Sequence, residues 1–206
     1  MNEFLSGLRN SESEEALIDF CRKQVLHGCP FVFKANEEAL YDFRKMIAAH
    51  FQVNFLEIYI TGSAKLGFSP HKGTIFSLES DVDVAIVSEK LFTEIMDQIH
   101  TYQLELRKGR KSISEAELKQ YHTFLEYTAL GWIRPDKLPT SFKIITLKDN
   151  WFNFFRSISN GKSSVGNYEV KAGVFKTYSH LERYLIEGYK QLQNQLKVKE
   201  THDKPN

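Results

Sequence analysis

The sequence is poor in the features that mark several protein classes. It has only two cysteines, Cys21 and Cys29, among 206 residues, and no second pair accompanies them to complete a zinc site. Two isolated cysteines are typical of a reduced cytosolic protein. No apolar run approaches the roughly 18 residues that a membrane span needs, and the first residues lack the pattern of a signal peptide. We therefore expect a cytoplasmic protein with no membrane partner.

Excess charge of either sign is also absent. Lysine and arginine total 27 against 26 aspartates and glutamates, which leaves a net charge of +1. Dedicated nucleic-acid scaffolds carry a marked basic excess, so that class is disfavoured, although RNA or DNA remains compatible as a transient substrate. The sequence shows no internal repeat, which excludes solenoid architectures. A hydrophobic fraction of 42% with 16 phenylalanines and 9 tyrosines indicates a globular protein with an aromatic core.

Hydrophobic periodicity and punctuation by glycine and proline predict the order of secondary structure. Side-chain caps favour the helix starts, notably at Asn36 and in the Ser114–Glu117 pair, which has the spacing of a capping box. The expected strands are 54–61, 81–88, 142–147 and 168–177. The expected helices are 11–28, the segment after Asn36, 63–68, 89–108, 114–131, 148–158 and 178–197. The expected loops and turns are 69–80, 131–139 and 159–167.

This order predicts an α+β fold, in which a small sheet is flanked by helices and the chain ends in a C-terminal helix. We expect residues 1–53 to form N-terminal helices that pack on the core. Residues 54–197 would form the main domain. Residues 198–206 are polar and are expected to form a flexible tail.

The expected strand at 81–88 carries an Asp-x-Asp pair. Side chains alternate along a strand, so Val82 and Val84 should enter the core while Asp81 and Asp83 lie side by side on the opposite face. Two adjacent carboxylates repel each other unless a cation lies between them. Mg²⁺ prefers oxygen ligands and keeps coordination places for substrate phosphates. The pair therefore predicts a site for Mg²⁺ or Mn²⁺ that receives a nucleoside triphosphate, with two solvated surface aspartates as the alternative.

A Gly-Ser pair follows the first expected strand directly. A strand that turns into a helix at Gly62 and Ser63 presents free backbone N–H groups and a hydroxyl, which suit a phosphate. Lys65, in the next turn, either contacts a phosphate as a point charge or is a solvated helix lysine. Alone, the Gly-Ser pair indicates only a turn. Followed by a short helix, a loop and the Asp-x-Asp strand, it is far more specific.

The segments TGSAKLGFSP and ESDVDVAIV resemble the signature of polymerase-β-like nucleotidyltransferases. With GWIRPD and the aromatic-rich last helix, the chain is similar to stand-alone bacterial nucleotidyltransferase-domain proteins over about 54–190. The resemblance implies a small mixed sheet of the nucleotidyltransferase type. It also implies triphosphate binding by Gly62 and Ser63, and two-metal catalysis at Asp81 and Asp83.

The resemblance also implies a third carboxylate on a later strand. Glu169, at the start of the expected strand 168–177, is our choice for the third catalytic acid. Strand alternation places it on the face opposite Val170, which belongs in the core. Asp136 and Asp149 are the alternatives.

We therefore expect a Mg²⁺- or Mn²⁺-dependent nucleotidyltransferase that takes a nucleoside triphosphate as substrate. The acceptor stays open between RNA such as a tRNA end, a protein side chain, an antibiotic hydroxyl and a second nucleotide. His71, in the loop beside the expected site, is either a general base or a structural residue. If no third acid converges, the alternative is a catalytically silent nucleotide- or partner-binding module of a defence or toxin–antitoxin system.

Overall fold

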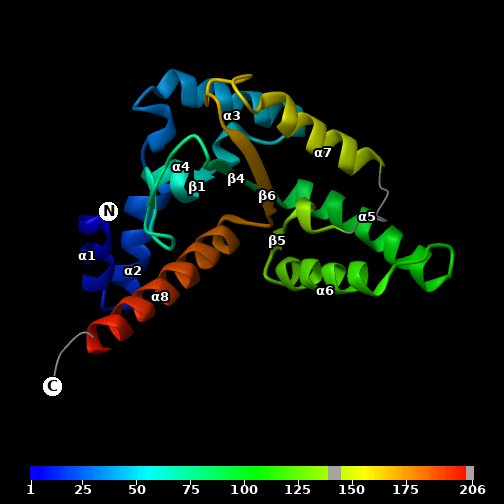
Figure 1. Cartoon of the computed structure of the whole chain (residues 1–206). Coiled ribbons are helices and arrows are strands. Elements are labelled where there is room, and N and C mark those ends of the chain that lie inside the picture. Colours follow the sequence, from blue (N-terminus) through cyan, green and yellow to red (C-terminus); the bar gives the residue numbers. More distant parts are fainter. Residues whose placement is uncertain (139–144, 203–206) are drawn as a thin grey trace.

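A computed structural model describes residues 1–138 and 145–202, with side chains described for 1–138 and 150–198. Its centre is a four-stranded sheet in which β4 and β6 are parallel, whereas β1 on β4 and β5 on β6 are antiparallel. The sheet is therefore small and mixed, helices surround it, and one of them ends the chain, as the α+β prediction requires (Figure 1). The strands, in spatial order, are β1 (Ile58–Thr61), β4 (Asp81–Val87), β6 (Glu169–Phe175) and β5 (Trp132–Ile133).

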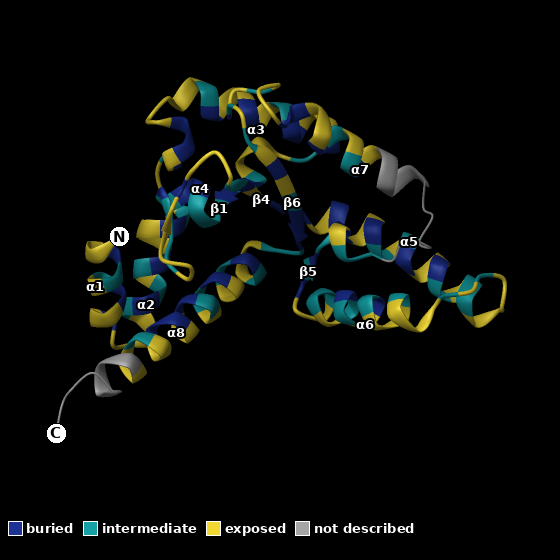
Figure 2. Ribbon diagram, viewed as in Figure 1, coloured by how far each residue is buried: buried dark blue, intermediate teal, exposed yellow. Residues whose placement is uncertain are grey.

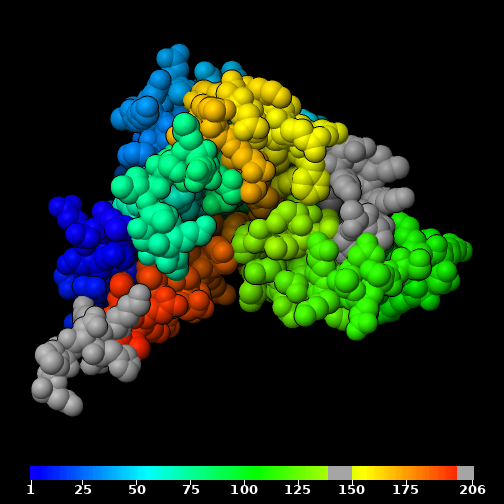
Figure 3. Space-filling model, in the orientation of Figure 1, coloured from blue at the N-terminus to red at the C-terminus, as the bar shows by residue number. Residues whose placement is uncertain are grey.

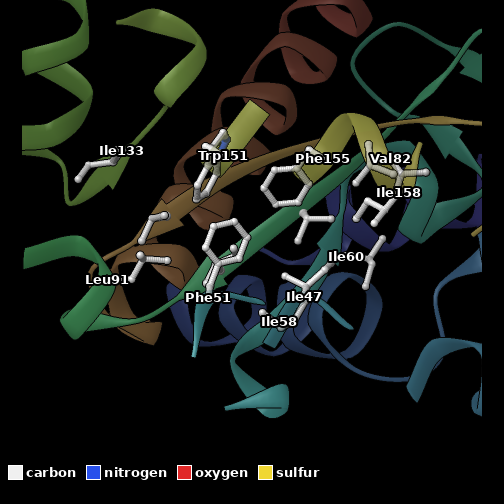
Figure 4. Packing of buried hydrophobic residues seen from close by; sticks show 14 of the residues in the cluster. Ile47, Phe51, Ile58, Ile60, Val82, Leu91, Ile133, Trp151, Phe155 and Ile158 are labelled. Carbon is white, nitrogen blue, oxygen red and sulfur yellow. The ribbon is translucent and has the colours of Figure 1, made fainter. Parts of the chain in front are cut away.

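One face of the sheet packs on the larger of two hydrophobic clusters. Phe51, Trp151 and Phe155 meet there with ring centroids 5.0–5.6 Å apart, beside isoleucines from the neighbouring strands (Figure 4). Aromatic pairs in such tilted and stacked contacts stabilise a core beyond the area that they bury. The helices that contribute are α3 (Glu37–Phe51), α5 (Glu89–Arg107), α6 (Glu115–Ala129) and α7 (Ile145–Ile158).

The opposite face is covered by α1 (Asn2–Asn10), α2 (Glu14–Cys21) and α8 (Tyr178–His202), which form the second cluster. Figure 2 shows the buried residues of α1, α2 and α8 on the sides where these helices meet. On this face Ala85, Val87 and Phe175 are buried, whereas the earlier positions of β4 and β6 carry partly or fully exposed charged residues. The amino-terminal ends of β4 and β6 are therefore left open on the α8 side.

The predicted caps account for where several helices begin. Asn36 Oδ1 accepts a hydrogen bond from the Ala39 backbone at 3.0 Å, and Ser114 with Glu117 forms the complete capping box at the start of α6. Each cap satisfies a backbone N–H that a helix terminus leaves without a partner. Both predicted helix starts are confirmed.

Three expected segments differ because local hydrogen bonds or tertiary pairing override the pattern. The expected strand 54–61 opens with a 3-10 turn at Phe55–Glu57. The expected loop 69–80 contains a short hairpin of β2 (Phe68–Ser69) with β3 (Thr74–Ile75). The expected turn 131–139 supplies β5, which pairs with the edge of β6.

The predictions also differ from the structure near residues 142–147 and at both ends of the chain. The strand expected at 142–147 is wrong from residue 145 onward, because α7 begins there, and residues 142–144 lie outside the described residues. Helix α1 was not expected, and α8 continues to His202, five residues past its expected end at 197. Among the helices of the described segments, none combines the length and apolar character that crossing a bilayer demands.

Candidate active site

Four charged side chains stand together where β4 and β6 begin. The register pairs Asp81 with Glu169 and Asp83 with Lys171 across the two parallel strands. Neighbouring strands lie about 4.8 Å apart and alternate residues share a face, so the four form a square on the α8 side of the sheet. Val82, between the two aspartates, is fully buried in the large core, which confirms the predicted orientation of the strand.

Lys171 joins the two acids at the outer end of the square. Its Nζ lies 2.8 Å from Asp81 Oδ2 and 3.3 Å from Glu169 Oε2. Since both oxygens are within 3.3 Å of one nitrogen, they are no farther apart than twice that distance, and Glu169 lies beside Asp81 as strand alternation predicts. The hydrogen bond to Asp81 raises the pKa of Lys171, with a smaller contribution from Glu169, so its ammonium group stays charged.

Asp83 occupies the inner end of the square, where it faces a cleft. Although part of the Asp83 side chain is exposed to solvent, the pKa of its carboxyl is raised, chiefly by desolvation among the surrounding groups and then by the negative charge of Asp81. The charges of Lys171 and Arg134 oppose this shift without cancelling it. Within the described side chains, no hydrogen bond or ion pair engages the Asp83 carboxylate, so a bound cation would relieve its electrostatic penalty.

Gly62 lies beside this carboxylate, which fills the space that a Cβ would need. Thr61 pairs with Asp83 across β1 and β4, which brings the following residue against the aspartate side chain. Gly62 has φ +64°, and a Cβ built there would lie 2.8 Å from Asp83 Oδ2. A side chain is therefore excluded by the left-handed backbone and by the close approach of the carboxylate.

Of the other two residues predicted to bind phosphate, Ser63 is half-buried in the first turn of α4 (Gly62–Leu66). Lys65 is only 7% exposed. Its ammonium group donates hydrogen bonds to the carbonyl oxygens of His27 and, at 2.8 Å, Gly28. Burial lowers its pKa. Lys65 thus ties α4 to the turn that ends the N-terminal helices, and we do not retain it as a phosphate ligand.

Lys65→Met is expected to lower the free energy of unfolding by about 1–3 kcal/mol, because it leaves two carbonyl groups without their donor. If the cleft binds a nucleotide, its affinity should stay unchanged, since Lys65 does not line the cleft. Urea denaturation and nucleotide titration measure the two effects. Lys119→Met, at an exposed position on α6, is the matched control. A selective loss of nucleotide affinity at wild-type stability would return Lys65 to the phosphate site.

A cleft of about 1480 Å³ opens beside the square. It follows the uncovered side of β6 between α7 and α8, and the space-filling view shows the surface hollowed between α8 and the segment that carries α6 and β5 (Figure 3). The cleft is mixed in character, because acids, cations and aromatic rings share its wall. Its charged and partly exposed aromatic lining includes Asp83, Glu169, Lys171, Arg134, Arg156, Arg183, Trp132, Phe152 and Tyr184.

Of the two alternative third acids, Asp136 lines the same cleft as Asp83 but is already paired. Asp136 makes a two-point ion pair with Arg134, with contacts of 2.8 and 3.1 Å. Asp149 lies in α7, and its side chain is outside the described residues. Across 1–138 and 150–198, no three histidine, cysteine, aspartate or glutamate side chains are arranged to hold a metal ion. The register places Glu169 beside Asp81, where both acids share the single positive charge of Lys171.

His71 lines the cleft from the β2–β3 hairpin. Its ring stacks on Tyr189 of α8 with centroids 5.9 Å apart and planes 29° apart. Desolvation lowers its pKa, so the imidazole is neutral at neutral pH and retains a nitrogen lone pair. This state is compatible with either alternative expected for His71, a base or a packing residue.

Two groups at the site were missed as functional candidates. Strand alternation identifies Lys171 as a neighbour of Glu169, but its contact with Asp81 depends on the register of two strands distant in the sequence. Trp132 stacks on Phe175 with centroids 5.4 Å apart and packs on Tyr184 at 4.3 Å. The sequence motifs contain Trp132 and Tyr184, but only the pairing of β5 with β6 brings their rings to Phe175.

Comparisons with protein-family models, curated proteins and solved structures found no match to this chain. These comparisons therefore offer no characterised relative for this chain. The contacts, charges and register of the cleft are what any functional proposal has to explain.

Proposed function

We propose that this chain is a metal-dependent nucleotidyltransferase of the polymerase-β-like type, which transfers a nucleoside monophosphate from a nucleoside triphosphate to an acceptor. The observation that carries the proposal is the arrangement around Asp83. This carboxylate lacks a described partner, faces a cleft, lies beside the left-handed Gly62 and shares a strand face with Asp81. The mixed sheet, with Glu169 in register with Asp81, supports the same assignment.

The donor set fits a hard divalent cation. Asp81 and Asp83 offer carboxylate oxygens, which Mg²⁺ and Mn²⁺ prefer, and the raised pKa of Asp83 reflects a negative charge that its surroundings do not balance. These two residues would hold the metal. When bound, Mg²⁺ or Mn²⁺ neutralises triphosphate charge and makes an acceptor hydroxyl more acidic.

Residues of the chain would position the phosphates and accept the proton of the acceptor. The backbone at Gly62 allows a phosphate to come close, and Arg134 and Lys171 supply positive charge near the acids. The acceptor oxygen would attack the α-phosphorus, the bond to the leaving pyrophosphate would break, and Glu169 would take the acceptor proton. Catalysis of this kind depends on positioning and electrostatic stabilisation. A cleft of about 1480 Å³ exceeds the roughly 300–1000 Å³ of ordinary ligand pockets, which would leave room for an acceptor beside the nucleotide.

A second candidate is the catalytically silent nucleotide- or partner-binding module. The ion pairs of Lys171 with Asp81 and Glu169 favour it, because both carboxylates already contact a cationic group of the chain. Such a module would bind a nucleoside triphosphate and release it unchanged.

Incubation with each α-labelled nucleoside triphosphate, Mn²⁺ and total cell extract separates the two candidates. Transfer predicts label on an RNA, a protein or a small molecule, together with released pyrophosphate. The Asp81→Asn/Asp83→Asn double variant is the control for contaminating activity. Saturable nucleotide binding with no label above that control would favour the silent module, and no binding at all would exclude both.

Glu169→Gln is expected to slow transfer by roughly 10²-fold, the range of general acid–base catalysis, while nucleotide affinity stays close to wild type. The reason is that glutamine cannot accept the proton, yet it keeps the size of the side chain. Single-turnover rates and calorimetric titration measure the two quantities. Glu187→Gln, which removes a carboxylate from the α8 wall of the same cleft, is the matched control. Transfer at the wild-type rate in Glu169→Gln would remove this residue from the mechanism.

A further inference from the structure

The square on β4 and β6 is unusual in its charge balance. Its three carboxylates and one ammonium group carry three negative charges and one positive charge, a net charge of −2. One divalent cation balances this charge. Two divalent cations would leave an excess of two positive charges, which is electrostatically unfavourable at such short distances.

The Lys171 ammonium group lies between Asp81 and Glu169, in the position of a cation that would bridge these two carboxylates. Its Nζ contacts one oxygen of Asp81 and one of Glu169, on two different strands. A lysine ammonium is a compact point charge with three donors, so it satisfies two carboxylates at once. Asp83, at the other end of the square, is left for a different cation.

We propose that Lys171 takes the place of one of the two metal ions that the resemblance implies, so that the chain binds a single divalent cation at Asp81 and Asp83. This inference deepens the proposed function and rests on it, because it presupposes that the acids bind metal. The site is then asymmetric. The Lys171 ammonium group, which belongs to the chain, lies at the Glu169 end. An exchangeable divalent cation would bind at the cleft-facing end.

The geometry of the strand makes the replacement specific to this position. Lys171 is opposite Asp83 in the register and two residues beyond Glu169, so its side chain starts on the same face as all three acids. Half of its side-chain surface is exposed, at 50%, and its removal should leave the fold intact. Lys171→Met keeps the aliphatic stem and deletes only the charge. Lys171→Arg keeps the charge.

Mn²⁺ titration of the full chain, followed by electron paramagnetic resonance of the free ion, tests the proposal without requiring activity. We expect one Mn²⁺ per chain in the wild type and in Lys171→Arg. Lys171→Met should bind two Mn²⁺ ions, because Asp81 and Glu169 are then both unbalanced. Lys119→Met, a charge deletion on distant α6, should bind one.

The possible failures are distinguishable. Two ions in the wild type, unchanged in Lys171→Met, would overturn the replacement while leaving the metal site and the proposed function standing. One ion in both proteins at equal affinity would also overturn it, since the lysine would then exclude nothing. If none of these proteins binds more Mn²⁺ than Asp81→Asn/Asp83→Asn, the acids are not a metal site and the proposed function fails with the inference.

Discussion

Asp83→Asn is expected to reduce nucleotide transfer by on the order of 10³-fold, the loss seen when a strong electrostatic contact to the transition state is removed. At the same time the variant should be more stable than the wild type in metal-free buffer at neutral pH. The reason is that asparagine ends the repulsion from Asp81 and the desolvation of a charge, which together raise the pKa of Asp83. Transfer of labelled nucleotide and thermal unfolding in a chelating buffer measure the two effects.

The stability difference has a defined dependence on pH. The pKa of Asp83 is higher in the folded state than the unfolded value of about 3.9. Between these two pKa values, the folded chain therefore holds a proton that the unfolded chain has released. Stability therefore falls as pH rises from the unfolded pKa through the folded pKa, and it is level above that window. Asp83→Asn lacks this loss, so its stability advantage should grow across the window and vanish below it.

Added Mn²⁺ supplies the control for Asp83. It should raise the melting temperature of the wild type much more than that of the variant, because only the wild type offers the paired carboxylates. A variant that transfers nucleotide at the wild-type rate, or that is less stable than the wild type in chelating buffer, would contradict the assignment of Asp83.

Gly62→Val is the second substitution with a large expected effect. Nucleotide affinity should fall below detection, because the new side chain would occupy the space next to Asp83 Oδ2 and move that carboxylate. The left-handed backbone at φ +64° should lower the free energy of unfolding by about 1–3 kcal/mol in addition. Ser63→Ala, by comparison, removes one hydrogen-bonding group and should cost about 1 kcal/mol of binding free energy.

Gly109→Val separates the two contributions at Gly62. Gly109 has nearly the same φ, +66°, and a Cβ placed there would have no neighbouring atom within 4 Å. It lies between α5 and α6, outside the lining of the cleft. It should therefore show the loss of stability without the loss of nucleotide binding, measured by urea denaturation and calorimetry. Equal nucleotide affinity in Gly62→Val and the wild type would exclude Gly62 from the binding site.

Segments with strong local signals were predictable. Helices α3 and α6 carry both a side-chain cap and a periodic apolar face, and β4 alternates valine with aspartate, so local geometry alone specifies what each element buries. The orientation of Asp81 and Asp83 follows from the same alternation. It holds in the structure because Val82 and Val84 fill the large core.

Other elements form only in the presence of their partners. Helix α1 buries Phe4 and Leu8, and the Phe4 ring packs edge-on against Tyr189 of α8 at 5.6 Å. Strand β5 has two residues, exists as a partner of β6, and stops before Pro135, whose nitrogen has no hydrogen for a further ladder bond. A short stretch of sequence contains neither the helix on which α1 packs nor the strand with which β5 pairs.

The sequence by itself determined which face of β4 Asp81 and Asp83 occupy, because alternation along a strand is a local property of the backbone. It also determined where most helices begin. Only the tertiary structure decided which side chains lie next to these residues. The register of β4 on β6 brought Lys171 between Asp81 and Glu169, and the packing of α4 on the N-terminal helices turned Lys65 away from the cleft. Pairing register and burial depend on contacts between segments far apart in the chain, which no local pattern encodes.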